Sequence, residues 1–136
     1  MDWKLELVVV PVADQDRAKA FYLERAGFDL VVDHQAGEDF RVIQVIPRGS
    51  ACAVVLMRNP EAAGSVQGLH LVVADIDAAR TELAGRGVEP GPVVHFDQGR
   101  QVDGPDPQRA DYNSFFEFHD PDGNGWLVQD VPSRAT

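Results

Sequence analysis

The chain has 136 residues, of which 44% are hydrophobic and 25% are charged, a composition typical of a folded globular domain. Its net charge of −10 argues against nucleic acid or an anionic membrane as a partner, because both favour positive charge. No apolar run approaches the roughly 20 residues of a membrane span, and no export signal is visible at the N-terminus. We therefore expect a cytoplasmic protein whose lone cysteine, Cys52, is buried and inert.

A short motif occurs twice in the chain. VADQD spans residues 12–16, and VADID spans residues 73–77, which is 61 residues later. Each copy follows an apolar strand and precedes a helical pattern, so the first Asp of each motif is placed to cap a helix. The two helical patterns end at Gly27 and Gly87, where glycine suits the left-handed residue beyond a helix. We interpret the chain as a tandem duplication.

The duplication predicts two modules of one strand, one helix and three strands. The first module spans about 1–62 and the second about 63–136. Further strands are predicted at residues 28–34, 40–47, 51–57, 88–96, 114–119 and 126–131. Residues 97–111 are polar and rich in Gly and Pro, which predicts a lid-like loop with solvated charges. Residues 120–125, DPDGNG, predict a structural turn between the last two strands.

Three stretches carry a resemblance to a known family. They are VADQDRAKAFY at residues 12–22, GLHLVVADID at residues 68–77 and FHDPDGN at residues 118–124. On a duplicated βαβββ unit they resemble the vicinal oxygen chelate superfamily, which includes glyoxalase I, extradiol dioxygenases and bleomycin resistance proteins. The resemblance implies a single α+β domain over residues 1–136, with a curled eight-stranded mixed sheet around a cavity and the helices outside. It also implies a homodimer.

The resemblance places the family's metal ligands at positions that lack donor atoms in this chain. In metal-dependent members, two ligands lie seven residues before the capping Asp residues, which here are Leu7 and Gly68, and a third corresponds to Leu127. The fourth, typically Glu, comes from the strand before the linker, and residues 40–60 contain no Asp, Glu or His. Because leucine and glycine offer no lone pair from a side chain, we expect neither the family metal site nor a cofactor.

Strand alternation predicts which side chains line the cavity. The expected pairs are Leu7 and Val9, Gly68 and His70, and Leu127 and Gln129. His95 is a candidate for the mouth of the lid, and Tyr112 is a candidate for its end. His70 is interpreted either as a hydrogen-bonding group for a ligand or as a structural histidine, since a rebuilt metal centre needs two more ligands than the sequence offers.

The aromatic residues near the C-terminus are expected to divide between the two faces of the sheet. Trp126 and Val128 have the opposite parity to Leu127, which predicts that they pack beneath a helix. Phe115, Phe116 and Phe118 are too closely spaced to share one face, so at least one is expected to meet the cavity. Arg41 and Gln44 lie on opposite faces of the third strand, and the sequence leaves open which of them faces inward.

Two functions from different classes fit these features. The first is a binding protein that sequesters a mid-sized, partly aromatic natural product or antibiotic without metal-dependent chemistry. The alternative is a lyase, isomerase or dioxygenase-type enzyme, with a relocated metal or with His70 as a general acid or base. A third reading is an interaction partner with a vestigial cavity. The fold hosts many activities, so the resemblance does not identify the ligand.

Overall fold

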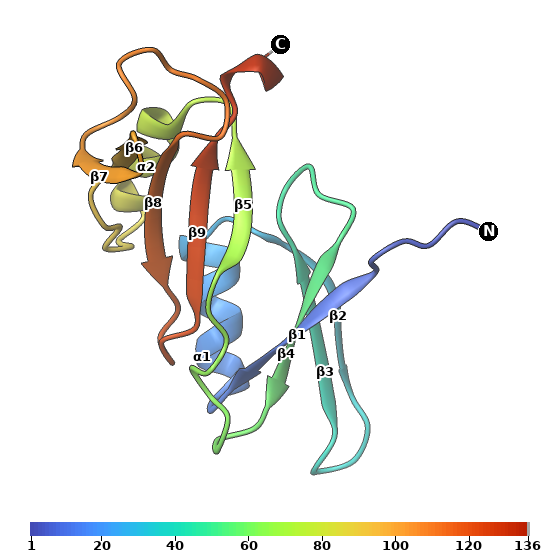
Figure 1. Cartoon of the computed structure of the whole chain (residues 1–136). Coiled ribbons are helices and arrows are strands. Elements are labelled where there is room, and N and C mark those ends of the chain that lie inside the picture. Colours follow the sequence, from blue (N-terminus) through green and yellow to red (C-terminus); the bar gives the residue numbers. More distant parts are fainter. Residues whose placement is uncertain (136) are drawn as a thin grey trace. The chain divides into compact units, whose positions relative to one another are not determined.

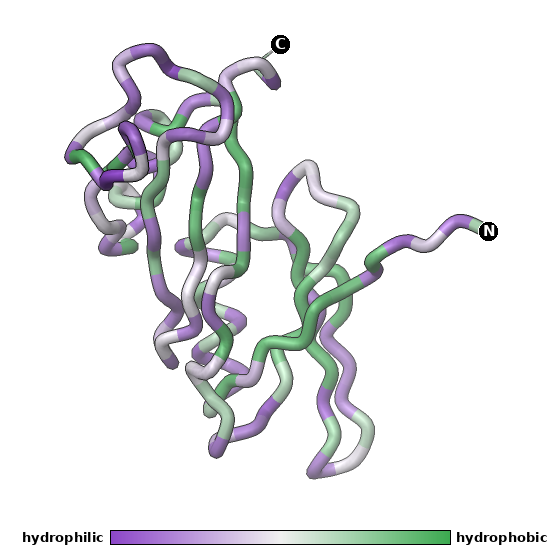
Figure 2. The backbone as a smooth tube through the Cα atoms, viewed as in Figure 1, coloured by the Kyte–Doolittle hydropathy of each residue, from purple (hydrophilic) through white to green (hydrophobic). Residues whose placement is uncertain are grey.

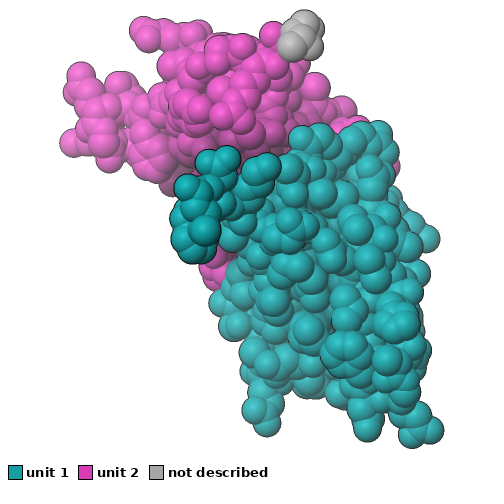
Figure 3. Space-filling view, turned by 90° about the vertical axis from the view of Figure 1, so that its right-hand side faces the viewer, with its two compact units in different colours: residues 1–66, 120–124 teal, residues 67–119, 125–136 magenta. Residues whose placement is uncertain are grey.

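The structure, a computed structural model, describes residues 1–135. The chain divides into two compact units (Figure 3). The first comprises Met1–Val66 together with Asp120–Asn124, and the second comprises Gln67–His119 with the residues from Gly125 onward. The short segment Asp120–Asn124, which joins two strands of the second unit, therefore folds as part of the first.

The first unit contains a four-stranded mixed sheet and one helix (Figure 1). Its elements are β1 (Leu7–Val12), α1 (Gln15–Ala20), the π-helical turn η1 (Phe21–Arg25), β2 (Asp29–Gln35), β3 (Arg41–Ile46) and β4 (Ala53–Arg58). The strand order is β1-β4-β3-β2, with β1 parallel to β4 and the other pairs antiparallel. The parallel pair requires a crossover, and α1 with η1 lies in that crossover connection.

The second unit repeats this plan with one additional strand. Its elements are β5 (Leu69–Val73), α2 (Ile76–Gly85), β6 (Val94–Asp97), β7 (Arg100–Asp103), β8 (Ser114–His119), β9 (Gly125–Asp130) and the 3₁₀ turn η2 (Pro132–Arg134). The order is β5-β9-β8-β6-β7, with β5 parallel to β9. The predicted α+β fold and the repeated βαβββ order are confirmed, but the strands form two sheets of four and five rather than one sheet of eight, because β7 adds a strand to the second unit. The prediction of one loop over residues 97–111 is wrong in part, because β7 pairs with β6 and shortens it.

The two repeated motifs start their helices in the same way. Asp14 accepts a hydrogen bond from the backbone N–H of Arg17 at 3.0 Å, and Asp75 accepts one from Ala78 at 3.1 Å. These bonds satisfy donors that the first turn of a helix leaves free. Past the helices, Gly27 has φ 81° and Gly87 has φ 86°, a region that side chains disfavour. The capping and glycine predictions are confirmed.

Each helix covers one face of its own sheet. In the first unit, Ala18 and Tyr22 are buried with strand residues such as Ile43 and Leu56. In the second unit, α2 packs against β8 and β9. Trp126 is 3% exposed and Val128 is 2% exposed, which confirms that they are core residues. Figure 2 shows β1, β4 and β5 as largely hydrophobic segments.

Two further expectations concern single features. Cys52 is half-buried, not fully buried as predicted, because it lies between the exposed Ala51 and the first buried residue of β4, Ala53. No helix among residues 1–135 is long and apolar enough to cross a membrane.

The turn of residues 120–124 is held by a dense set of buried hydrogen bonds. Asp120 is 5% exposed, and its Oδ2 accepts from the Tyr22 hydroxyl at 2.8 Å and from Asn124 Nδ2 at 2.9 Å. Its Oδ1 accepts from the backbone N–H groups of Asp122 and Asn124. Asn124 also donates to the Pro11 carbonyl and accepts from the Val66 N–H. The predicted structural role of this turn is confirmed, and its partners all belong to the first unit.

Candidate functional site

The face of the second sheet that points away from α2 carries a mixed set of partly exposed side chains. We call it the open face; its members are His70, Val72, Val94, Phe96, Phe115, Glu117, Leu127 and Gln129. The strand register places His70, Leu127 and Glu117 in one row across β5, β9 and β8. A second row contains Val72, Gln129 and Phe115. Side chains of the opposite parity, such as Phe116 and Trp126, are buried instead.

A cavity of about 290 Å³ lies on this face. It is lined by Pro92, Val94, Phe96, Gln101, Phe115, Phe116, Glu117 and Leu127. The rings of Phe96 and Phe115 meet edge to face, with centroids 5.7 Å apart and planes inclined by 76°. Of the three closely spaced phenylalanines, Phe116 and Phe118 are buried and Phe115 reaches the open face. The volume lies at the low end for a small-molecule site, and the wall is mainly apolar, as such sites usually are.

His70 is held in a defined orientation at the end of this face. Its Nδ1 donates a hydrogen bond to the Gly68 carbonyl at 3.0 Å, which leaves Nε2 with the lone pair in the neutral ring. The residue is exposed on β5. Gly68 has φ 77°, a left-handed conformation in which a side chain would be strained. The position that carries a metal ligand in the family thus has a backbone shaped for glycine.

The residues described by the structure contain no group of three or more His, Cys, Asp or Glu side chains that could hold a metal ion. Leu127 occupies the centre of the row between His70 and Glu117. Its hydrocarbon side chain makes this point of the open face apolar. The arrangement is suited to contact with an apolar ligand surface and offers no set of converging donors for a cation such as Zn²⁺.

Gln129 and Tyr112 connect the open face to the loop before β8. Gln129 Nε2 donates to the Tyr112 carbonyl at 3.1 Å, and the Tyr112 N–H donates to the Asp130 carbonyl at 2.8 Å. Tyr112 adopts φ 67°, which is unusual for a residue with a side chain, and is 50% exposed. Two hydrogen bonds therefore attach the end of the loop to β9, and one of them engages the amide nitrogen of Gln129.

His95 lies on the other face of its strand. Its neighbour Val94 pairs with Phe115 on the open face, so the side chain of His95 has the opposite parity and is 7% exposed. Its Nδ1 donates to the Gly104 carbonyl at 2.7 Å. It lines a separate cavity of about 320 Å³ with Asp106 and other loop residues. The structure thus brings His70, Leu127 and Gln129 together on one face and separates His95 from them.

The prediction that the charges of residues 97–111 are solvated holds for Arg100, Asp103 and Asp111, which are exposed, but not for Asp106. Asp106 is 7% exposed and accepts from the N–H groups of Gln108 and Ala110. These bonds hold the pKa of Asp106 below its usual value, and the bond from the Gln108 N–H has the largest effect. The expectation of ordinary solvation is wrong for Asp106 because its carboxylate accepts hydrogen bonds from the backbone of its own loop.

Arg109 fastens the same loop to the rest of the second unit. Its guanidinium lies 3.0 Å from Asp77 and 3.8 Å from Asp75, both at the start of α2. Its Nε lies 3.3 Å from Oδ2 of Asp130, an ion pair whose geometry falls short of a hydrogen bond. Asp130 is fully buried, and this burial raises its pKa although Arg109 acts in the opposite direction. These partners are distant in sequence, so no local pattern could have revealed them.

In the first unit, Leu7 and Val9 lie on the face of the sheet that points away from α1. Val9 is 49% exposed, and its register partner Val55 pairs in turn with Gln44. Arg41 has the opposite parity and forms ion pairs with Asp16 of α1 and Asp33 of β2. The question that the sequence left open is answered: Gln44 shares the face of Val9, and Arg41 lies on the helix side.

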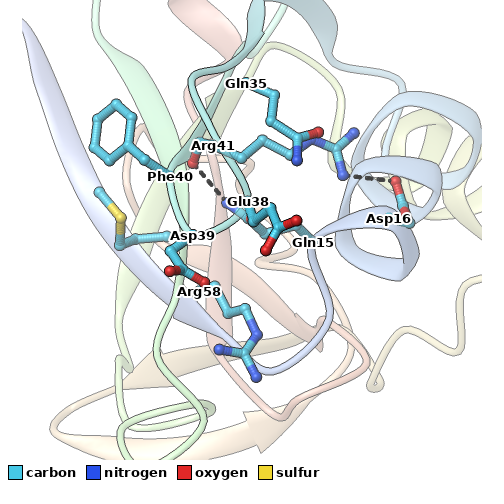
Figure 4. A pocket seen from close by; sticks show the side chains of 9 residues that line it. Gln15, Asp16, Gln35, Glu38, Asp39, Phe40, Arg41 and Arg58 are labelled. Carbon is cyan, nitrogen blue, oxygen red and sulfur yellow. Dashed lines mark hydrogen bonds and ion pairs between the residues drawn. The ribbon is translucent and has the colours of Figure 1, made fainter.

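A larger cavity, of about 550 Å³, opens on the helix side of the first unit (Figure 4). Gln15 crosses it and donates to the carbonyls of Arg41 and Leu56, both at 2.9 Å. Arg41 turns toward Asp16, while Phe40 is 52% exposed at its rim (Figure 4). Much of the polar wall is therefore bonded within the protein. Sequence reasoning missed this cavity because it forms only where the hairpin between β2 and β3 approaches the start of α1.

Comparisons with known proteins agree on the type of fold. The profile described as the Glyoxalase/Bleomycin resistance protein/Dioxygenase superfamily matches residues 4–128. Among solved structures, the chain is similar to TnmS3, an antibiotic binding protein from Streptomyces sp. CB03234, with 35% identity, a TM-score of 0.74, and coverage of 96% of this chain and 97% of that one. A glyoxalase/bleomycin resistance protein from the same organism is 36% identical, with a TM-score of 0.71 and coverage of 93% and 100%.

One curated relative comes from a different bacterium. The chain is 29% identical over 126 residues to the uncharacterized protein YetH of Bacillus subtilis (strain 168), covering 90% of this chain and 94% of YetH. These relatives match at least 90% of the chain, so the similarity includes both modules.

Proposed function

The chain belongs to the Glyoxalase/Bleomycin resistance protein/Dioxygenase superfamily, and we propose that within it the chain acts as a binding protein for a small molecule. The ligand is a mid-sized, partly aromatic natural product or antibiotic, held without metal-dependent chemistry. The observation that carries the proposal is the apolar cavity of the open face, which is lined by Phe96, Phe115 and Leu127, the last of these at a family metal-ligand position. The 35% identity to an antibiotic binding protein supports it.

The proposed contacts divide into apolar and polar ones. Phe96, Phe115 and Leu127 receive the aromatic part of the ligand, since aromatic rings favour edge-to-face and offset packing. Removing about 200 Å² of apolar surface from water is worth roughly 5 kcal/mol before the costs of association. His70 Nε2 and the amide oxygen of Gln129 then supply hydrogen bonds that orient the ligand.

The remaining predicted site residues have supporting roles in the proposal. Gly68 orients His70 through its carbonyl, and Tyr112 closes the loop end beside Gln129. Leu7 and Val9 offer a second apolar surface on the sheet of the first unit. His95 acts indirectly, by shaping the loop through its bond to Gly104.

The proposal is tested by titrating the purified chain with candidate antibiotics and following tryptophan fluorescence. Trp3 is 88% exposed and would dilute the signal, so a Trp3→Phe background leaves only Trp126, which neighbours Leu127. We expect saturable binding, together with increased tolerance of a drug-sensitive host that expresses the chain. A folded sample that binds none of the compounds would contradict the proposal.

We predict that Phe115→Ala weakens binding about 10-fold, because an aromatic contact in a cavity contributes about 1–2 kcal/mol. Phe40→Ala is the matched control: it removes an exposed ring at the cavity of the first unit, so affinity should not change. Circular dichroism of both variants verifies the fold. Equal loss of affinity in the two variants would place the ligand elsewhere.

The alternative function is an enzyme that uses His70 as a general acid or base, and the fixed orientation of its ring favours this second candidate. A relocated metal is the other form of this alternative. We predict that protein purified without chelator contains less than one equivalent of zinc, iron, manganese or nickel by elemental analysis. Stoichiometric metal that disappears in His70→Ala would instead favour the enzyme.

We also propose that the chain is a cytoplasmic homodimer. Several large apolar side chains are exposed on the strands, including Val9 and Val72. Exposed apolar patches often mark protein interfaces. Light scattering after size exclusion should give about twice the monomer mass, and a monomer over a wide concentration range would contradict this assembly.

A further inference from the structure

Glu117 is the one ionisable side chain among the residues that line the cavity of the open face. The other lining residues are apolar, apart from the amide of Gln101. Glu117 is exposed on β8, next to Leu127 in the strand register, so its carboxylate shares the face of the two aromatic rings. A single charge at the wall of an apolar cavity is a feature that a ligand of opposite charge can use.

Among residues 1–135, the carboxylate of Glu117 has no hydrogen-bond or ion-pair partner. No ion pair or side-chain hydrogen bond of the described residues involves it, while its backbone pairs with Leu127 in the sheet and its carbonyl accepts from the Gly91 N–H at 2.8 Å. Three acids of the second unit differ from it: Asp77 and Asp130 pair with Arg109, and Asp106 accepts hydrogen bonds from backbone groups. Glu117 is thus available to a ligand, whereas these acids are used by the fold.

Resting on the proposed function, we propose that Glu117 selects ligands with a cationic group, such as a protonated amine, attached to a planar aromatic body. The body contacts Phe96, Phe115 and Leu127, and the cation pairs with Glu117. His70 lies two strands away in the same row, about 10 Å from Glu117 by strand spacing, and accepts a hydrogen bond from the far end of the ligand. The net charge of −10 favours the approach of such a ligand.

The test compares three planar tricyclic dyes of different charge: the cation proflavine, the neutral acridone and the anion anthraquinone-2-sulfonate. Binding to the 136-residue chain with Trp3→Phe is measured by fluorescence at low salt and at 0.3 M salt. We expect proflavine to bind at least 10-fold more tightly than the anion, and this preference to shrink at high salt. A charge-assisted hydrogen bond contributes about 1.5–3 kcal/mol, so Glu117→Gln should weaken proflavine binding by about 10- to 100-fold and leave acridone unchanged.

Glu89→Gln is the matched control, because Glu89 is an exposed acid of the same unit outside the cavity. It makes the same change in net charge and should leave all three affinities unchanged. If Glu117→Gln and Glu89→Gln have equal effects, or if the cation has no advantage, charge selection by Glu117 is overturned while the proposed binding function stands. If none of the dyes binds saturably, charge selection by Glu117 is overturned, and the titration with antibiotics decides separately whether the binding function stands.

Discussion

Asp120→Ala is expected to lower the free energy of unfolding of the first unit by about 3–5 kcal/mol. The carboxylate accepts four hydrogen bonds, from the Tyr22 hydroxyl, the Asn124 side chain and two backbone N–H groups. Asp120 is 5% exposed and Asn124 is fully buried, so the donors left behind find little water. Each unsatisfied buried donor costs about 1–3 kcal/mol, and their sum exceeds the small entropic gain of a shorter side chain.

Urea denaturation followed by circular dichroism measures this effect. Tyr22→Phe removes one of the four bonds and should cost about 1 kcal/mol, because the phenyl ring keeps its packing. Asp39→Ala, an exposed acid of the β2–β3 hairpin, is the control and should shift the midpoint little. If Asp120→Ala and Asp39→Ala unfold at the same urea concentration, the turn does not stabilise the unit as we infer.

Arg109→Met is expected to destabilise the second unit by about 2–3 kcal/mol at pH 7.5. The change removes the cation that faces Asp75, Asp77 and the fully buried Asp130. Breaking a buried ion pair costs about 3–5 kcal/mol; the value here is lower because the Arg109 side chain is 38% exposed and partly screened by water. The loop around Asp106 loses its attachment to α2.

The pH dependence of this variant follows from the raised pKa of Asp130. A carboxyl whose pKa is higher in the folded state favours folding below its unfolded pKa, and this stability is lost as the pH rises through the folded pKa. Arg109 lowers the pKa of Asp130, so removing Arg109 raises that pKa further. The loss of folding stability with rising pH then continues to a higher pH. We therefore expect Arg109→Met to be more destabilising at pH 7.5 than at pH 4.5, where more of Asp130 is protonated.

Two measurements check this second prediction. Urea midpoints at both pH values give the destabilisation, and hydrogen exchange of the amides between Gly104 and Asn113 reports release of the loop. Arg100→Met removes an exposed arginine of β7 that forms no ion pair within residues 1–135, and it should leave both unchanged. A destabilisation that is the same at both pH values would show that the charge of Asp130 is not involved.

The elements of the fold follow largely from local sequence. The VADxD motifs cap both helices through Asp14 and Asp75, and Gly27 and Gly87 take the left-handed conformation predicted for them. Side-chain alternation places Trp126 in the core, as predicted. The main correction is β7, a strand in the excursion after residue 97. Its sequence is polar and short, and it becomes a strand because β6 offers an edge for pairing.

The candidate site was predictable only in part. Side chains alternate between the two faces along β5 and β9, and paired residues of neighbouring strands point to the same face. His70, Leu127 and Gln129 therefore lie on one face. The same reasoning could not assign His95, because the start of β6 depends on its pairing with β8. It also gave no weight to Glu117, whose importance rests on being unpaired beside two aromatic rings.

The sequence by itself determined the duplicated architecture and the absence of donor side chains at Leu7, Gly68 and Leu127. Both are local properties, set by spacing and by the chemistry of single residues. Only the tertiary structure decided which charges are used by the fold and which are available to a ligand. Arg109 forms ion pairs with Asp77 and Asp130, whereas the Glu117 carboxylate lines the cavity without an ion pair among the described residues. The physical reason is that an ion pair depends on distance in space, and residues such as Asp77 and Arg109 become neighbours only when the sheet has formed.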